Sequence, residues 1–512
     1  MSHRVTLLSS LGLASTRAAL AFALPALGAT FFACGGDFKY AECPDGTEQN
    51  GGGHVDEACQ RPDGSGGAGG AGGTGGAPPG GGSGGAGGGG GSPQVPPGAE
   101  CAPMQTRCAE GAQQTCGGDG TWGAEAACDL ACDKGGVACV VPVQLAADSK
   151  HVCARLSDGT VRCWGSDEAE SLGNGDGGNQ TKPQAIDGLE GVVELDPTGH
   201  CARFEDQTAR CWGTNNTFRF DPSSAVTSLK APSPLVGAAG AVAISVGERH
   251  TCLLDGAGAA LCKGNSTLGL IGQPGFDPQA EYVPVATTAR FASLTSASEA
   301  TLGSNLGLTK EGSVYCWGIA SDCGGAAPDD GLGTPESEYL YKPKAVPSVS
   351  SIKALGQGTI PCAVGADGRA QCWGRNDLGQ LGRGTSGNAL LGAGPVATLD
   401  AVVQMASGIA HACAVKEDGT LYCWGANNKG QLGATCGPTL PCQTNTTTNT
   451  SFVPNASKVD LAGVVEVRPA GSFTCARTAD SKVYCWGDNS KGQLGDGTTG
   501  VGRAKPEPVV WK

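Results

Sequence analysis

The sequence predicts an all-β protein whose main part, residues 141–512, is a seven-bladed β-propeller. The first observation is a repeated Cys-Trp-Gly motif, whose third copy alone departs from the pattern (Cys262-Lys263-Gly264); its cysteine stands at positions 163, 211, 262, 316, 372, 423 and 485. The second is the spacing of the copies, roughly 50 residues, which is typical of propeller blades. The third is that each unit consists of short β-branched and aromatic runs between Gly/Asp turns, which indicates antiparallel strands. Seven such sheets arranged radially would leave only short, protected edges.

A hairpin in most units is expected to bring two cysteines face to face. In the first unit, Leu156–Thr160 predicts a three-residue hairpin loop with Gly159 in the left-handed conformation. Counting outward places Cys153 opposite Cys163 at a non-hydrogen-bonded position, where Cα atoms approach to about 4.5 Å, as a disulfide needs. The prediction is six cross-strand disulfides, and the alternative is six pairs of buried thiols. The pairs are Cys153 with Cys163, Cys201 with Cys211, Cys252 with Cys262, Cys362 with Cys372, Cys413 with Cys423, and Cys475 with Cys485.

Two further pairings follow from position in the sequence. In the fourth unit Leu306 occupies the place of the first cysteine, so Cys323 is the available partner of Cys316. Cys436 and Cys442 lie in the longest insertion between units and are expected to bridge each other. Of the 25 cysteines, 24 remain when Cys34 is set aside. An even number is expected of a fully bridged exported protein.

The repeat H-x-C-A-x-x-x-D-G-x-x-x-C-W-G-x-N-x-x-G-Q-L-G, seen at His411–Gly433, resembles the repeat of the RCC1 (regulator of chromosome condensation) family. The resemblance covers about residues 141–512, is most specific at Asn376–Gly382, Asn427–Gly433 and Asn489–Gly495, and is weakest in units two and four, which lack the GQLG tail. It implies a seven-bladed β-propeller, in agreement with the count of units. The best-known activity it implies is guanine-nucleotide exchange on a nuclear GTPase, while secreted bacterial members bind and inhibit another protein.

The chain is expected to begin with an export signal, residues 1–34. Its start is mildly basic, and residues 18–33 are apolar but too short to span a bilayer. The segment ends at Cys34, in a context that resembles a bacterial lipoprotein box, where the thiol is acylated after cleavage. The prediction is a lipoprotein anchored through Cys34 at the bacterial outer membrane or cell surface. The alternative is ordinary cleavage after Gly28 and secretion.

Two segments are expected between the signal and the folded part. Residues 35–63 are polar and hold Cys43 and Cys59, which predicts one bridged loop. Residues 64–98 are almost entirely Gly, Ala, Ser and Pro. Because such a segment cannot bury a core, it is expected to be a flexible linker.

Residues 99–140 are expected to form a small cysteine-rich module. It contains six cysteines (101, 108, 116, 128, 132 and 139). A segment of this length rarely sustains a hydrophobic core, so three disulfides of undetermined connectivity are expected to hold it. A zinc site that includes Cys128 and Cys132 is the alternative.

The last strand of the chain is expected to close the ring. Most units open with a strand of the form Lys182-Pro183-Gln184-Ala185-Ile186, the first unit has none, and a further copy stands at Lys505–Val509. Residues 505–511, with Pro506, Pro508 and Val509, are therefore predicted to pair with the first blade near Val143. Such pairing would protect an open sheet edge, and proline suits an outer strand.

No catalytic, metal or cofactor site is predicted. Each propeller histidine stands just before the first cysteine of its unit, which favours a structural role over acid/base or metal chemistry (His151, His200, His250 and His411). The motif tryptophans are expected to pack blade against blade (Trp164, Trp212, Trp317, Trp373, Trp424 and Trp486). Acidic groups at 167–170 and 322–338 are interpreted as solvated loop charge rather than calcium or glycosidase carboxylates.

The net charge and the expected export of the chain limit the classes of function that the sequence favours. The net charge is −14, without a Lys/Arg cluster, so nucleic-acid binding is not expected. The main hypothesis is a non-enzymatic, monomeric, protein-binding propeller at the cell surface, whose membrane contact is its lipid anchor and whose partner is an unidentified surface or extracellular protein. The irregular connections 214–234, 319–342 and 434–452 are expected to form the binding surface. The alternatives are a polysaccharide hydrolase or lyase with a carboxylate cleft and, by family analogy, nucleotide exchange.

Overall fold

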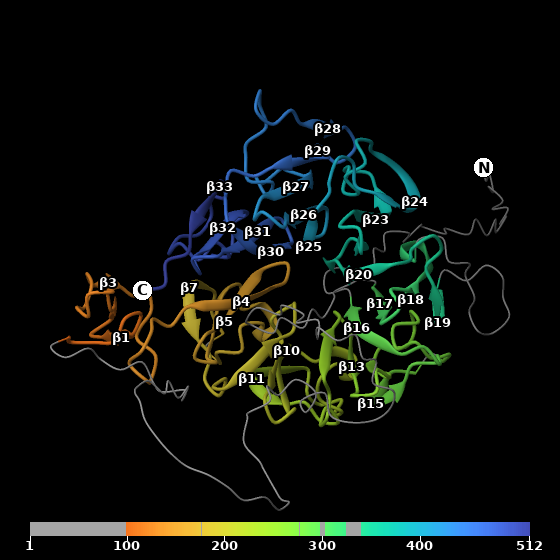
Figure 1. Cartoon of the computed structure of the whole chain (residues 1–512). Coiled ribbons are helices and arrows are strands. Elements are labelled where there is room, and N and C mark those ends of the chain that lie inside the picture. The colour runs from red at the N-terminus through yellow and green to blue at the C-terminus, as the bar shows by residue number, and fades with distance from the viewer. Residues whose placement is uncertain (1–98, 176, 276, 297–302, 324–338) are drawn as a thin grey trace, which may run out of the picture. The chain divides into compact units, whose positions relative to one another are not determined.

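The computed structural model describes residues 99–512 except 176, 276, 297–302 and 324–338. Between residues 142 and 508, seven sheets built on antiparallel four-stranded meanders follow one another along the chain and stand side by side around a ring (Figure 1). The fold is the predicted seven-bladed β-propeller. We number the blades 1 to 7 in chain order. No helix in the described ranges is long and apolar enough to cross a membrane.

The first four blades have four strands each. Blade 1 comprises β4 (Pro142–Ala147), β5 (His151–Leu156), β6 (Val161–Gly165) and β7 (Gln180–Ala185). Blade 2 comprises β8 (Val192–Leu195), β9 (Cys201–Phe204), β10 (Ala209–Thr214) and β11 (Ser228–Pro234). Blade 3 comprises β12 (Ala243–Val246), β13 (His250–Leu254), β14 (Ala260–Gly264) and β15 (Gln279–Pro284). Blade 4 comprises β16 (Phe291–Ser296), β17 (Ser304–Thr309), β18 (Val314–Ile319) and β19 (Tyr339–Ala345).

Blades 5 to 7 are also built on four strands each, and two short strands extend the sheet of blade 6. Blade 5 comprises β20 (Ile352–Leu355), β22 (Cys362–Gly365), β23 (Ala370–Asn376) and β24 (Gly387–Pro395). Blade 6 comprises β25 (Val402–Ser407), β26 (His411–Lys416), β27 (Leu421–Ala426) and β29 (Thr450–Lys458), extended by β28 (Gln443–Asn445) and by β21 (Gln357–Gly358). Blade 7 comprises β30 (Val464–Ala470), β31 (Phe473–Thr478), β32 (Val483–Gly487) and β33 (Arg503–Pro508). Short 3-10 turns are η2 (Glu168–Glu170), η3 (Asn216–Phe218) and η4 (Ala320–Asp322).

The cysteine-rich module contains three short strands, β1 (Thr106–Ala109), β2 (Ala112–Thr115) and β3 (Ala126–Ala127). Its disulfides are Cys101–Cys116, Cys108–Cys132 and Cys128–Cys139. The sulfur atoms of Cys128 and Cys132, which would bind zinc in the alternative interpretation, are both bonded in these disulfides. The described residues divide into two compact units: residues 107–113 with 125–512, and residues 99–106 with 114–124. The expectations for Cys34, Cys43, Cys59 and the linker 64–98 lie outside the described residues.

The hairpin disulfides follow from the turn that precedes the motif. In blade 1, the Asp158 carboxylate accepts a hydrogen bond from the Thr160 amide at 3.1 Å, and Gly159 has a φ of 77°, which favours glycine. The resulting register places Cys153 opposite Cys163, with the Cα atoms 4.1 Å apart. The same hairpin register recurs in blade 4, where Leu306 faces Cys316 and only the cross-strand disulfide is missing.

Eight disulfides lie in the described propeller. Six are the predicted ten-residue pairs: Cys153 with Cys163, Cys201 with Cys211, Cys252 with Cys262, Cys362 with Cys372, Cys413 with Cys423, and Cys475 with Cys485. The other two are Cys316 with Cys323 and Cys436 with Cys442. In blade 5 Cys362 faces Cys372, and in blade 6 Cys413 faces Cys423, each across one antiparallel ladder. All eight pairings in the structure are those that the sequence predicts.

The predicted closing strand was wrong. β33, which contains Pro506 and Pro508, pairs with β32 of its own blade, where Cys485 faces Glu507. The physical reason is the phase of the repeat. The Lys182–Ala185 segment is the fourth strand of blade 1, paired with β6, and does not open the next unit. Every blade therefore contains its own fourth strand, and blade 1 is complete with four strands.

The ring closes through side chains. Glu466 of blade 7 accepts a hydrogen bond from the Leu145 amide of blade 1 at 3.1 Å, and Arg468 donates to the Leu145 carbonyl oxygen at 2.8 Å. The same contact joins neighbouring blades elsewhere, because the Gln404 side chain of blade 6 accepts from the Val467 amide of blade 7 at 2.9 Å. Beyond β33, Val509 is buried in one apolar cluster with residues of blades 7 and 1. The last seam thus resembles the others.

Candidate functional site

The motif tryptophans join each blade to the one before it. Trp212 of blade 2 donates its indole Nε1–H to the carbonyl oxygen of Ser171 in blade 1, at 3.1 Å. A Cβ on Gly173 would lie 2.6 Å from the Trp212 ring, so the closing glycine of the repeat allows the indole to approach. The same donor–carbonyl pair occurs at Trp164–Gln493, Trp317–Leu270, Trp424–Gln380 and Trp486–Gln431. The tryptophans lie between blades, as the sequence predicted.

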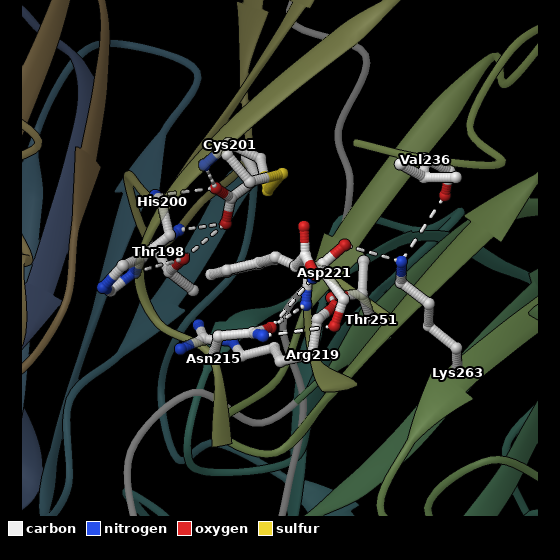
Figure 2. The surroundings of a disulfide bond; sticks show 12 residues. Thr198, His200, Cys201, Asn215, Arg219, Asp221, Val236, Thr251 and Lys263 are labelled. Carbon is white, nitrogen blue, oxygen red and sulfur yellow. Dashed lines mark hydrogen bonds between the residues drawn. A yellow bond between two sulfur atoms is a disulfide. The ribbon is translucent and has the colours of Figure 1, made fainter. Parts of the chain in front are cut away.

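The seam between blades 2 and 3 departs from this rule. The tail of blade 2 ends in Asp221 where the repeat has glycine, and blade 3 carries Lys263 in place of tryptophan. Lys263 is buried, and its ammonium donates to the Phe220 carbonyl oxygen at 2.7 Å and to the Val236 carbonyl oxygen at 3.4 Å (Figure 2). Burial lowers the pKa of Lys263 to about 8. Two departures that lie far apart in the sequence therefore meet at one seam.

Two of the four propeller histidines also join neighbouring blades. His250 is within 2.7 Å of the Asn305 side-chain oxygen of blade 4, and His411 is within 2.9 Å of the Thr474 hydroxyl of blade 7. Both are fully buried, and burial lowers the pKa of His250 to about 4 and that of His411 to about 3. Both rings are therefore neutral at physiological pH, in agreement with a structural role.

One surface cleft stands apart from this repeated packing. It has a volume of about 440 Å³. Its walls come from the connections between first and second strands (residues 148–150 and 248–249) and between third and fourth strands (168–171 and 214–219). In an antiparallel meander these two kinds of connection lie at the same end of the sheet. We call this end of the propeller the cleft face.

A buried ion pair lies at one side of the cleft. The Asp148 carboxylate is 2.7 Å from His151 Nδ1, and the His151 ring meets the His200 ring edge-on with centroids 4.9 Å apart. Burial opposes both charges, but each partner outweighs it: the pKa of Asp148 lies below, and that of His151 above, the usual value. Burial, together with the charges of Arg219 and His151, holds the pKa of His200 well below its usual value.

His200 is positioned by a second carboxylate. Its Nδ1 lies 3.1 Å from the Thr198 hydroxyl, which donates to Asp196 at 2.5 Å (Figure 2). Asp196 also accepts hydrogen bonds from the backbone amides of Thr198, His200 and Cys201. Burial raises the pKa of Asp196. This network ties the loop before β9 to the disulfide Cys201–Cys211.

The Asp148, His151 and His200 donors lie within 4.8 Å of one another, a spacing compatible with a metal ion. The surroundings of the His151 ring favour its protonation over metal binding. His151 Nδ1 faces Asp148, and a Cβ on Gly199 would lie 3.3 Å from His151 Nε2, so this nitrogen faces backbone. The backbone of Gly199 also raises the pKa of His151. The Asp148 charge and the Gly199 backbone both favour the protonated ring, and protonation competes with metal binding.

Arg219 is a buried cation in the wall of the cleft. It is 5% exposed and occupies the place of the repeat glutamine in blade 2. Its guanidinium carbon lies 4.6 Å from the centre of the Phe220 ring. Within the described residues it forms no salt bridge, and its Nε has no hydrogen-bond partner. Burial lowers the pKa of Arg219 to about 10, so it stays charged at neutral pH.

The centre of the ring offers little room. First strands and their loops enclose a channel with a volume of about 20 Å³, lined by one segment from each blade. Its described lining contains Arg468, serines and prolines but no carboxylate. The channel therefore holds about one water molecule and no acid/base pair.

Two of the three connections expected to bind a partner, 214–234 and 434–452, lie at the cleft face, because each joins the third and fourth strands of its blade. Residues 214–219 form one wall of the cleft, and the disulfide Cys436–Cys442 holds the connection 434–452. Most of the connection 319–342 lies outside the described residues. Sequence reasoning missed Arg219 and Asp196. The signal for Arg219 was the loss of the GQLG tail at Phe218–Asp221.

Two sequence models of the "regulator of chromosome condensation (RCC1) repeat" match the chain. One matches residues 402–431 and 471–493, and the other residues 367–415 and 418–476. The chain is 30% identical over 258 residues to the probable E3 ubiquitin-protein ligase HERC6 of Homo sapiens. The matched region covers 49% of this chain and 23% of HERC6. The chain is also 37% identical over 124 residues to the ultraviolet-B receptor UVR8 of Arabidopsis thaliana, 23% of this chain and 27% of UVR8. The chain thus spans about a quarter of either relative.

Solved structures share the fold. Prp20p from Saccharomyces cerevisiae, in a structure whose title describes binding to Gsp1p and histones, superposes with a TM-score of 0.59 at 19% identity, over 72% of this chain and 87% of that one. Human WBSCR16 superposes with a TM-score of 0.52 at 19% identity, over 68% and 93%. At this identity the likeness concerns the fold. The matched models thus show RCC1 repeats within residues 367–493, and the solved structures show that the described propeller shares their fold.

Proposed function

We propose that this protein is a non-enzymatic protein-binding propeller, exported and held at the cell surface by a lipid on Cys34. The observation that carries the proposal is the contrast between the two kinds of residue in the repeat. Repeated tryptophans, histidines and cysteines are buried between or within blades. The non-repeated residues gather in connections at the cleft face. Binding sites are commonly built from such variable loops on a rigid scaffold.

Relatives supply precedents for protein binding. Prp20p is described with Gsp1p and histones, and yeast RCC1 (Prp20) has been crystallised with Kap60 bound. The ligase activity named for HERC6 belongs to a protein of which this chain spans 23%, so it gives no support for an enzyme here. Eight disulfides in the described propeller favour an oxidising compartment over a nuclear one.

The polysaccharide-cleaving alternative is not favoured by the cleft. A glycosidase needs one carboxyl group with a raised pKa as its general acid. In the cleft, Glu168 is paired with Lys150 at 2.5 Å, which lowers its pKa, and Asp148 is held below its usual value by His151. Both groups are therefore ionised and cannot donate a proton at neutral pH.

The function is tested by comparing two faces of the propeller. The exported chain is used as bait, with chemical cross-linking, on a surface fraction of the source organism. One variant replaces the exposed residues Asn216, Thr435 and Thr439 of the cleft face by Lys. The matched control replaces Ser157 and Glu417, in hairpins at the opposite end, by Lys. A partner lost with the first variant and kept with the control supports the proposal. Absence of any stoichiometric partner, or equal loss with both, contradicts it.

The anchor is tested separately. Cys34→Ala should move the protein from the membrane fraction to the soluble exported fraction, because acylation requires the thiol. Mass spectrometry of the mature N-terminus gives the second measurement. A variant that stays membrane-bound, or a mature protein beginning at Ala29, would show that Cys34 is not the anchor.

A further inference from the structure

We propose that the cleft binds a carboxylate group of the partner protein, an acidic side chain or a chain end, through the guanidinium of Arg219. This inference rests on the proposed protein-binding function and names the chemistry of one contact. Arg219 is a buried cation of the cleft wall: its Nε has no hydrogen-bond partner, and the residue forms no salt bridge within the described part of the chain. A buried guanidinium without acceptors is costly. Its planar fork matches a carboxylate, which can accept two parallel hydrogen bonds.

The backbone and ring contacts of Arg219 hold it in place for such a ligand. Its carbonyl oxygen accepts a hydrogen bond from the Thr251 hydroxyl of blade 3 at 2.8 Å. Its guanidinium carbon lies 4.6 Å from the centre of the Phe220 ring. A side chain fixed in this way loses little further freedom when it binds, which favours affinity.

Two of the three carboxylates around Arg219 are engaged with other groups, and the third, Glu248, has one buried oxygen without a hydrogen-bond partner among the described residues. Asp148 pairs with His151, and Asp196 accepts hydrogen bonds from the Thr198 hydroxyl and three backbone amides. Asp196, Asp148 and Glu248 favour the charged form of Arg219 through space. The guanidinium is therefore kept charged at the wall of the cleft without a salt bridge to any of these groups among the described residues. On the rim, Arg249 adds a second cation.

Backbone strain on both walls points to the same place. In blades 6 and 7 the first residue of the GQLG tail is a glycine with positive φ, Gly430 and Gly492. In blades 1 and 2 the equivalent residues are Glu170 and Phe218, with φ of 62° and 63°. Such conformations cost on the order of 1–3 kcal/mol each and cluster at binding sites. Ala169 and Thr217, which precede these two residues, also have positive φ, 57° and 61°, and line the cleft.

The volume suits a small part of a protein. About 440 Å³ lies within the range of roughly 300–1,000 Å³ that is typical of ligand sites. It admits an acidic side chain with its neighbouring residues, or the last residues of a chain. A flat interface would need no such cleft.

The experiment measures binding of fluorescein-labelled pentapeptides to the full chain by anisotropy. The probes are amide-capped Gly-Gly-Asp-Gly-Gly, its Asn and phosphoserine counterparts, and Gly-Gly-Gly-Gly-Gly with a free carboxyl end. The Asp or free-carboxyl peptide should bind roughly tenfold or more tightly than the Asn peptide, as expected for a charge-assisted pair. The stronger of the two distinguishes an acidic side chain from a chain end.

Variants assign the effect to Arg219. Arg219→Gln should abolish the preference for a carboxylate, and Arg219→Lys should reduce it because the charge remains and the fork is lost. Arg290→Gln, an exposed arginine in the connection between β15 and β16, is the matched control and should change nothing. Thiol counts and melting temperature verify that each variant is folded.

Three results would overturn the inference: no preference for carboxylate over amide, a preference that survives Arg219→Gln in a folded variant, or binding of phosphoserine alone. The protein-binding function is judged by the cross-linking experiment. If a partner is captured at the cleft face and Arg219→Gln leaves its capture unchanged, the function stands and the carboxylate contact fails.

Discussion

At the scale of the residue, one pair of positions decides how two blades meet. Where the repeat ends in glycine, a tryptophan of the next blade packs on that glycine. Its indole N–H donates to the carbonyl oxygen of the residue two positions before the glycine. A side chain at that position would overlap the indole, because a Cβ on Gly382 would lie 2.8 Å from Trp424. Blade 2 has Asp221 at this position, and blade 3 has the thinner, flexible side chain of Lys263 in place of the tryptophan. The two departures compensate each other.

This compensation predicts a coupling that a double-mutant cycle measures. Lys263→Trp alone should destabilise the protein by about 1–3 kcal/mol, since the indole is forced against Asp221. Asp221→Gly alone loses a neighbour that favours the charged form of Lys263. The double variant, which restores the repeat, should be more stable than the sum of the singles by roughly 0.5–3 kcal/mol. Urea unfolding gives the three free energies. Additive effects would show that the two positions do not communicate.

The buried histidines predict acid sensitivity. Burial depresses the pKa of His411 to about 3 and that of His250 to about 4, so the unfolded chain binds more protons than the folded one between these values and 6.5. Stability should fall as the pH drops below 6.5, by about 1.4 kcal/mol per pH unit for each such group. His411→Gln should make this dependence shallower by about that slope between pH 6 and 4.5. An unchanged slope in urea unfolding would contradict the assignment.

At the scale of the element, the sequence predicts the hairpins well and the blade boundaries poorly. A turn of fixed length determines its own register, so Cys153 and Cys163 could be placed opposite each other from local residues alone. The Lys-Pro strands could not be phased in this way, because a strand between two motifs can pair with the unit before it or after it. The register of β7 with β6 decides the matter. The cleft was missed for a related reason: its residues are the ones that do not repeat.

The hairpin disulfides predict the thiol content of the native protein. Protein purified from an oxidising compartment should show no free thiol after denaturation, because every cysteine in the described chain is bridged. Reduction should lower the melting temperature, with each ten-residue loop worth roughly 2–3 kcal/mol in the chain-entropy model. Thiol titration in denaturant, before and after reduction, is the measurement. Ten or more titratable thiols in unreduced protein would mean that these pairs are buried cysteines.

At the scale of the whole molecule, the ring is closed by packing of two complete blades rather than by a shared strand. Leu145 of blade 1 is held by Glu466 and Arg468 of blade 7, both buried and paired with each other at 2.9 Å. The residues after β33 reinforce this seam. The Trp511 ring meets the Trp164 ring edge-on with centroids 5.9 Å apart, and the Arg162 guanidinium donates to the Trp511 carbonyl oxygen at 3.4 Å.

The seam predicts a long-range effect of the last residues. Trp511 is 8% exposed and packs with Leu145, Trp164 and Phe473, so Trp511→Ala should cost about 3–5 kcal/mol. Because the contacts of Trp511 cross to blade 1, hydrogen exchange should accelerate in β4 and β6, at the other end of the propeller sequence, as well as in β32. Val501→Ala, at an exposed position just before β33, is the control and should change neither stability nor exchange. Exchange that accelerates in blade 7 alone would mean that Trp511 stabilises its own blade and that blade 1 holds the seam without it.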